Sequence, residues 1–264
     1  MKFQIIIRLL LIMIALQIIH PLSVSAATYS YAAGTYSWID PSSHTNAVWT
    51  AAPGGPANEC TSNSAAIDDD ITQELSLGFA FSFGGTNYTT VRIMSNGRLQ
   101  FNNRFCGYGT QSNSIPRIYP YPMPDTRLNR TMRVYGADLD PSIGGSVKYA
   151  SLGAAPNRSF VVTWTNIREW GSASSNFNLQ VILYENGSFK YQYGSITNST
   201  QGHAQIGWEA STSDYELSIY SNVTTLQNTA LLFSADNPSA TVLYSLDEAT
   251  WSSAAGEIKD SSGS

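Results

Sequence analysis

The chain has 264 residues and a formal net charge of −5, and only 12 % of its residues are charged. Its Lys and Arg residues form no basic stripe, which argues against nucleic acid as a partner because phosphates are bound by clustered cations. Low charge together with abundant Ser, Thr, Asn and Gly is typical of exported β-proteins and unlike a cytosolic helical enzyme.

Residues 1–26 are interpreted as a secretory signal peptide. Lys2 and Arg8 form its positive end, residues 5–19 are apolar, and Val24-Ser25-Ala26 is a small-residue cleavage site. A retained membrane anchor is the alternative, although Pro21 favours cleavage. The sequence therefore predicts a secreted or cell-surface chain with no membrane span once the signal is removed.

Residues 27–66 are expected to form an irregular leader, since Pro53-Gly54-Gly55-Pro56 rules out a continuous element there. One strand is predicted near residues 36–39. The leader ends shortly before the strongest strand pattern of the chain, in which apolar residues occupy every second position from Leu75 to Phe83. This period of two predicts a strand with one buried face.

Two hairpins are predicted from Asn-Gly pairs. Around Ser95-Asn96-Gly97, a three-residue loop would pair Ile93 with Leu99 and place the apolar side chains on one face. Around Asn186-Gly187, a two-residue turn would pair Tyr184 with Phe189. The strand that precedes this second turn is apolar on both faces, which predicts a central position in its sheet.

Short strands continue along the chain without amphipathic helices between them, and prolines interrupt residues 103–127. The pattern predicts an all-β fold, an antiparallel β-sandwich of about ten strands. Trp164 and Trp208 lie inside predicted strands and are assigned to its core. Strands are expected at about 75–83, 89–94, 98–102, 133–139, 146–151, 159–166, 177–185, 188–193, 204–209 and 216–220, with weaker ones at 230–233 and 241–245.

Cys60 and Cys106 are the only cysteines. In an oxidising compartment they predict one disulfide, which would tie the loop before the first strong strand to the loop after residue 101. Two isolated cysteines lack the paired spacing of a zinc site.

Acidic residues are concentrated in two places. Asp68, Asp69 and Asp70 are consecutive, and Asp138 and Asp140 lie on one face of a short extended segment. Carboxylates of this kind are candidates for binding Ca²⁺, and they would form one site if the two segments were neighbours. The alternatives are an acidic loop for the triplet and turn formation for Asp140, which precedes Pro141. A glycosidase that uses these carboxylates is a third, weaker hypothesis.

Aromatic side chains outside the strongest strands are candidates for ligand contact, because aromatic faces stack on sugar rings. The candidate residues are Trp38, Trp49, Tyr119, Tyr121 and Trp170.

Three segments carry a resemblance to a known family. They are LGFAFSFGGTNYTTVRIMSNGRLQF (77–101), ADLDPSIGGSVKYASLGAAPNRSFVVTWTNI (137–167) and FNLQVILYENGSFKYQYGSI (177–196). Together they resemble the nidogen-like extracellular domain of bacterial surface proteins, over about residues 65–222. Within that group the chain is most similar to the N-terminal part of the MSHA pilus biogenesis protein of the Q type. Residues 239–264 look like the start of a truncated laminin-G or concanavalin-like module, which leaves 67–238 as the nidogen-like domain.

This resemblance implies a noncatalytic surface module for adhesion or recognition, carried on or near a type IV pilus. Its expected partners are an extracellular protein or glycan surface and pilus components, and it implies no cofactor besides the Ca²⁺ considered above. The alternative function is a substrate- or carbohydrate-binding module of a larger secreted hydrolase.

Overall fold

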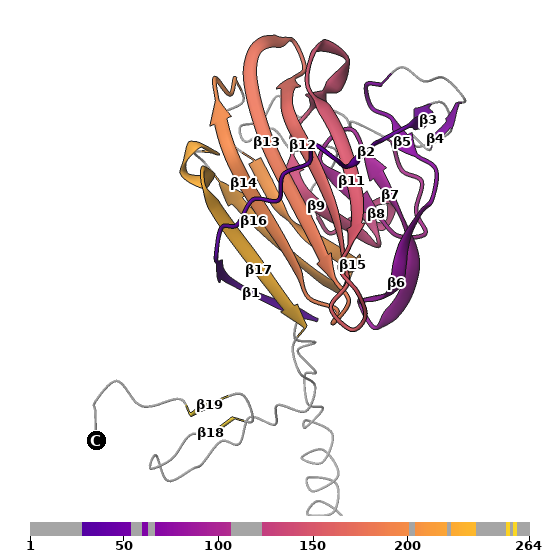
Figure 1. The fold of residues 1–264 in the computed structure, drawn as a ribbon, viewed down its shortest axis with the longest axis vertical. Coiled ribbons are helices and arrows are strands. Elements are labelled where there is room, and N and C mark those ends of the chain that lie inside the picture. The colour runs from indigo at the N-terminus through magenta and orange to yellow at the C-terminus, as the bar shows by residue number, and fades with distance from the viewer. Residues whose placement is uncertain are drawn as a thin grey trace, which may run out of the picture.

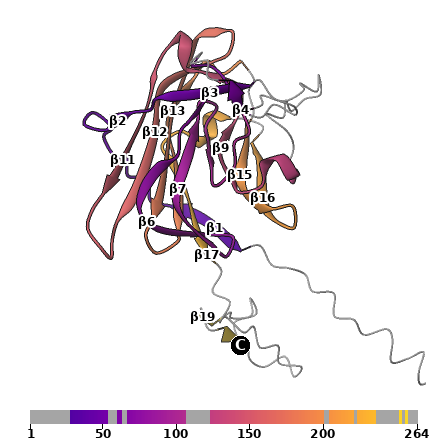
Figure 2. The ribbon, with the colours of Figure 1, turned by 90° about the vertical axis from the view of Figure 1, so that its right-hand side faces the viewer.

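A computed structural model describes residues 28–53, 60–62, 67–106, 123–200, 204–220, 223–235, 252–253 and 256–257. The signal-peptide segment and most of the predicted laminin-G-like segment lie outside the described residues. Two antiparallel sheets face one another, as Figure 2 shows from the side. The described residues contain no α-helix, so the predicted all-β antiparallel sandwich is confirmed. Nor do they contain any helix long and apolar enough to cross a membrane.

The first sheet has eight strands in the order β1-β17-β14-β13-β12-β11-β2, with β10 paired to β12 beside this path. Its strands are β1 (Tyr29–Gly34), β2 (Thr45–Asn46), β10 (Leu139–Asp140), β11 (Ser146–Leu152), β12 (Ser159–Glu169), β13 (Ser172–Tyr184), β14 (Phe189–Thr197) and β17 (Thr229–Ala235). The doubly apolar strand β13 is central, as predicted.

The second sheet has nine strands in the order β16-β15-β9-β8-β7-β5-β3-β4, with β6 paired to β7 beside this path. Its strands are β3 (Trp49–Pro53), β4 (Cys60–Ser62), β5 (Ile71–Thr72), β6 (Leu75–Phe83), β7 (Thr86–Met94), β8 (Arg98–Gln100), β9 (Thr131–Gly136), β15 (Ala204–Ser211) and β16 (Asp214–Tyr220). Short 3₁₀ turns are η2 (Thr126–Leu128), η3 (Pro141–Ile143) and η4 (Val223–Leu226), and β18 (Ser252–Ser253) pairs with β19 (Gly256–Glu257).

The core between the sheets is rich in aromatic side chains. On β6, the five apolar side chains are buried and the four small residues between them are exposed, which confirms the predicted alternation. Trp164 and Trp208 are fully buried. The rings of Phe189 and Phe233 stack at 4.5 Å between centroids, which joins β14 to β17 inside this core.

The N-terminal leader differs from its prediction. Its described part carries four strands instead of an irregular path, and the strand expected at 36–39 lies at Tyr29–Gly34, where it pairs with β17. Tyr29 decides this position because its ring is 2 % exposed and packs 5.1 Å from Trp208 and 5.0 Å from Phe189.

Residues 35–44 have no strand of their own, yet they cross the outer face of β14, β13 and β12 on the way to β2 (Figure 1). Glutamine side chains hold this crossing. Gln192 accepts from the Ser37 N–H at 2.6 Å and donates to the Ser37 carbonyl at 2.8 Å. Gln180 makes the equivalent pair with Ile39 at 3.1 and 2.9 Å. Each amide thus replaces the backbone partner that a neighbouring strand would supply.

The two hairpins gave different outcomes. Ile93 pairs with Leu99 around a three-residue loop in which Gly97 has a φ of +70°, so the first prediction is confirmed. The second is wrong by one residue, because Leu183 and not Tyr184 pairs with Phe189. Gly187 has a φ of +88°, and the loop is again one residue longer than a two-residue turn.

The predicted disulfide joins Cys60 to Cys106, whose Cα atoms are 5.1 Å apart. Both cysteines are buried with Ile71 and Met94 in a small apolar cluster of their own. The same two segments are also joined by hydrogen bonds from the Cys60 N–H to the Arg104 carbonyl, at 2.8 Å, and from Arg104 Nη2 to the Cys60 carbonyl, at 2.7 Å.

Candidate functional site

The chain crosses from one sheet to the other at Asp138. Strand β9 belongs to the nine-stranded sheet, and β10, two residues further on, pairs with β12 of the eight-stranded sheet. The carbonyl of Asp138 accepts a hydrogen bond from the Trp170 N–H, at 2.9 Å. This crossover therefore fixes Asp138 beside the hairpin that joins β12 to β13.

The loop that carries the acidic triplet is bound to the turn after β7. The Ser95 N–H donates to the Asp70 carbonyl at 2.9 Å, and the Asp70 N–H donates to Ser95 Oγ at 3.1 Å. Asn96 Nδ2 donates to Asp69 Oδ1 at 2.7 Å. The turn that sets the register of the first hairpin thus also positions the triplet.

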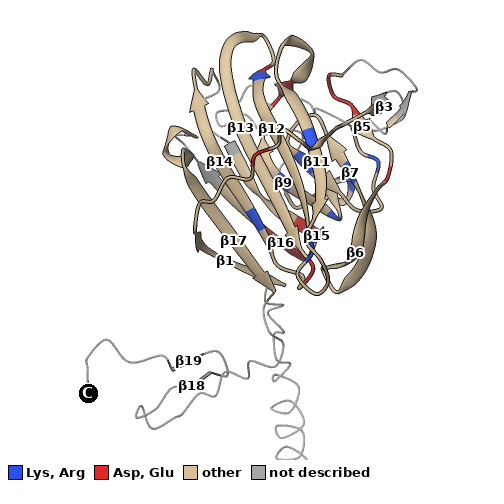
Figure 3. Ribbon diagram, in the orientation of Figure 1, with Lys and Arg blue, Asp and Glu red and all other residues tan. Residues whose placement is uncertain are grey.

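Three of the five predicted acidic residues converge. Asp68, Asp69 and Asp138 each offer a carboxylate oxygen, and these oxygens all lie within 4.8 Å of one another. These three residues are called the acidic cluster. Acidic segments lie beside β5 and near the upper end of β12 in Figure 3.

The other two acidic residues have local roles. Asp70 Oδ2 accepts from the Ile67 N–H at 2.8 Å, within its own loop. Asp140 accepts from the Ser142 N–H at 2.8 Å and from the Ser142 hydroxyl, so it caps η3. The turn-forming alternative therefore describes Asp140, while Asp138 belongs to the cluster.

Burial and mutual repulsion raise the pKa of all three cluster carboxyls from 3.8 to about 7. For Asp138, burial is the largest cause, followed by the charges of Asp68, Asp140 and Glu169. For Asp69, burial and Asp138 outweigh the opposing effects of Asn96 and Arg98. The three groups therefore repel one another when ionised, which a bound cation would relieve.

Exposed apolar side chains lie in or beside the segments that carry these acidic residues. Ile67 is next to Asp68 in sequence, Ile143 closes the η3 turn that follows Asp140, and Trp170 is bonded through its N–H to Asp138. Their exposed fractions are 39 %, 45 % and 57 % respectively. The term acidic end is used below for the acidic cluster together with these three side chains.

The remaining candidate aromatics are placed differently. Trp38 is half-buried, with its ring centroid 6.3 Å from that of Tyr36. Trp49 is partly buried against the main core. Tyr119 and Tyr121 lie outside the described residues. Among the three candidate aromatics that the structure describes, only Trp170 thus combines exposure with a hydrogen bond to the segment that carries Asp138.

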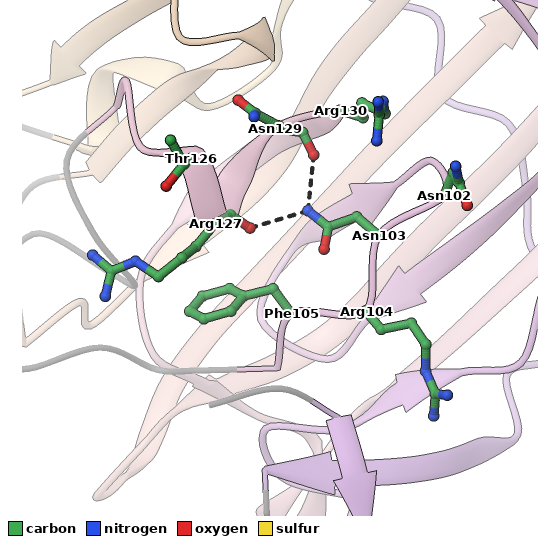
Figure 4. A pocket seen from close by; sticks show the side chains of 8 residues that line it. All are labelled: Asn102, Asn103, Arg104, Phe105, Thr126, Arg127, Asn129 and Arg130. Atoms are coloured by element: carbon green, nitrogen blue, oxygen red, sulfur yellow. Dashed lines mark hydrogen bonds between the residues drawn. The ribbon is translucent and has the colours of Figure 1, made fainter. Parts of the chain in front are cut away.

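A polar pocket of about 500 Å³ lies between the segment after β8 and η2 (Figure 4). Its floor is fixed by Asn103, whose Nδ2 donates to the carbonyls of Arg127 at 3.0 Å and Asn129 at 2.8 Å. Two of the lining guanidinium groups are already engaged, Arg127 with Asp125 and Arg104 with the Cys60 carbonyl. No chemical motif in the sequence marks the residues that line this pocket.

A further buried carboxyl group is that of Glu209 on β15. Glu209 is fully buried and accepts hydrogen bonds from the Asp125 N–H at 3.0 and 3.2 Å. Burial raises its pKa from 4.5 to about 7, against the opposing effects of this N–H and of Arg133.

Glu209 predicts a pH dependence of stability. Native Glu209 holds its proton more tightly than the unfolded chain does, so its contribution is complete below pH 4.5 and is lost as the pH rises through about 7. The loss is at most about 3.5 kcal/mol, at about 1.4 kcal/mol per pKa unit. Urea unfolding at pH 5 and pH 8 should show a smaller pH difference in Glu209→Gln than in wild type. Glu74→Gln, at a half-exposed carboxylate paired with Arg92, is the matched control. An unchanged pH difference in Glu209→Gln would contradict this assignment.

The fold and the site define a disulfide-bonded antiparallel β-sandwich with an acidic, partly apolar end. A family model described as NIDO related matches residues 28–245, and the chain belongs to this family. No curated protein and no solved structure was found to match it. The family and the disulfide fit an extracellular protein.

Proposed function

We propose that the chain is a noncatalytic extracellular adhesion module that recognises surface glycans through its acidic end. Family membership supports the extracellular and adhesive part of this function. The observation that carries the glycan part is the position of Trp170. Residue Trp170 is 57 % exposed, and its backbone N–H donates to the backbone carbonyl of Asp138, which places an exposed aromatic residue in the turn beside the segment that carries Asp138.

The chemistry of this end suits a sugar. An exposed indole offers an apolar face for the C–H side of a sugar ring, while neighbouring carboxylates accept hydrogen bonds from its hydroxyl groups. Carbohydrate and small-ligand sites generally combine aromatic surface with a few polar groups in this way. Ile67 and Ile143 would extend the apolar part of the contact.

The arrangement of the carboxyl groups supports binding rather than hydrolysis. Hydrolysis of a glycosidic bond uses two carboxyl groups on opposite sides of the scissile bond, with the substrate between them. In the acidic cluster three carboxylate oxygens lie within 4.8 Å of one another, which suits a single small ion and is shorter than the about 5–5.5 Å of retaining and the about 6.5–9.5 Å of inverting glycosidases. We therefore expect no turnover of polysaccharides by this chain.

A glycan array probed with the full chain tests the proposal. Trp170→Ala should lower binding to the recognised glycans by about thirtyfold, because truncation of an aromatic contact of this kind costs about 2 kcal/mol. Tyr215→Ala removes an aromatic side chain of 38 % exposure from β16 and should leave binding unchanged. Binding to matrix proteins alone, or glycan binding that does not change in Trp170→Ala, would refute recognition through this end.

The attachment to a type IV pilus and the laminin-G-like tail remain proposals from the resemblance to MSHA-type proteins. The alternative, a binding module of a larger secreted hydrolase, is favoured by the same exposed indole. The two proposals predict different neighbouring domains in the same polypeptide. A hydrolase domain there would favour the alternative, while pilus-assembly segments would favour the adhesion module.

A further inference from the structure

We infer that the acidic cluster is a Ca²⁺ site, in which Asp68, Asp69 and Asp138 provide the carboxylate ligands. This inference does not depend on the proposed glycan recognition, since ion binding is measured without any glycan. It rests on the spacing of the three carboxylates and on the surroundings of Asp138.

The spacing matches ligands of one ion. Ca²⁺ is bound by oxygen atoms at about 2.3–2.6 Å, so two oxygens on the same ion are at most about 5 Å apart. The three oxygens of the acidic cluster lie within 4.8 Å of one another. They come from two segments about 70 residues apart in sequence, and the backbone contacts around Ser95 and Trp170 hold these segments in place.

The surroundings of Asp138 provide an independent observation. Residue Asp138 is only 6 % exposed, and none of the hydrogen bonds among the described residues ends on its carboxylate. Asp68 Oδ1 is likewise buried without a described partner. Buried carboxylates are normally paired, hydrogen-bonded or bound to a metal, because burying an unpaired one is costly. A cation between the two groups would satisfy both.

The ligand chemistry selects the ion. All three ligands are carboxylates, which suit a hard cation such as Ca²⁺, whereas Zn²⁺ sites are generally built from cysteine and histidine. Ca²⁺ also accepts irregular geometry and completes its shell with carbonyl oxygens and water, while Mg²⁺ requires a near-ideal octahedron. A site on irregular loops with three carboxylates therefore fits Ca²⁺ better than Mg²⁺.

Thermal unfolding of the full chain tests the inference. Extracellular modules commonly bind Ca²⁺ with a dissociation constant of about 10⁻⁴–10⁻³ M. At that affinity, 10 mM CaCl₂ should raise Tm by about 3–10 °C relative to EDTA, at equal ionic strength. Asp138→Asn and Asp68→Asn should each abolish most of this rise. Asp68 is only half-buried, so Asp68→Asn should fold and still test the site if Asp138→Asn does not fold.

Asp40→Asn is the matched control. Asp40 is an exposed carboxylate bonded to Ser42 in the leader, and its variant loses the same charge without touching the cluster. This variant and Trp170→Ala should retain the full rise in Tm. No rise in wild type, a full rise in Asp68→Asn, or an equal rise with MgCl₂ would each overturn the assignment. Because Trp170→Ala retains the ion effect while losing glycan binding, failure of one proposal is distinguishable from failure of the other.

Discussion

Replacement of Tyr29 by alanine is expected to lower the free energy of unfolding by about 3–5 kcal/mol, the usual range for removing a buried aromatic side chain. Tyr29 is 2 % exposed and its ring lies within 6 Å of those of Phe83, Phe189 and Trp208. Its hydroxyl also donates to the Ser82 carbonyl at 2.7 Å. The variant therefore loses packing against both sheets and one partly buried hydrogen bond.

Chemical denaturation and thermal scans would measure the effect, which corresponds to a Tm lower by about 6–20 °C for a domain of this size. The matched control is Tyr31→Ala on the same strand, since Tyr31 is 43 % exposed. The control variant loses the ring contact between Tyr31 and Phe233. Its free energy of unfolding should otherwise change by less than about 1 kcal/mol. Equal losses in the two variants would contradict the role of Tyr29 as the anchor of β1.

The leader shows where sequence patterns were insufficient. Residues 29–34 contain two tyrosines and several small residues, so no alternation of apolar side chains marks a strand. Its pairing with β17, about 200 residues later, is decided by tertiary packing of Tyr29. Gln180 and Gln192 hold the next segment through side-chain amides, and an isolated glutamine in a strand gives no sign of such a role.

The two hairpins show when register can be predicted. On β6 to β8 one face is apolar and the other polar, so a shift by one residue would turn the apolar side chains away from the core between the sheets. Strand β13 is apolar on both faces, and this criterion is lost there. The observed register places Phe189 and Tyr191 opposite Leu183 and Val181, and all four side chains are fully buried.

The sequence could predict that acidic residues form the site, but it could not predict which of the five acidic residues belong to the acidic cluster. Sequence alone could name five carboxylates and the condition that their segments be neighbours. Asp140 could have been assigned to a cap, because an Asp before Pro-Ser is a common start of a helical turn. Asn96 and Glu169, by contrast, act on the cluster through contacts between distant segments.

Removal of the disulfide is the second large effect that we expect. The bridge closes a loop with a sequence separation of 46 residues. In the chain-entropy model, a loop of about this length restricts the unfolded chain enough to stabilise the fold by about 4 kcal/mol. The double variant Cys60→Ala/Cys106→Ala should therefore unfold at a Tm lower by about 8–16 °C. Alanine is preferable to serine, since both positions lie in an apolar cluster with Ile71 and Met94.

The double variant tests whether the bridge acts on the unfolded chain, because other contacts hold the two segments together in the folded protein. The hydrogen bonds between Cys60 and Arg104 join the same two segments and should persist in the double variant, so its folded structure should change little. A reducing agent should destabilise wild type to the level of the double variant and leave the double variant unchanged. If the double variant matched oxidised wild type in Tm, the bridge would not stabilise the fold. If the double variant lost the circular-dichroism signal of folded β-sheet altogether, the bridge would instead be needed for the nine-stranded sheet to form at β3 and β4. These strands precede the loop that carries Asp68 and Asp69.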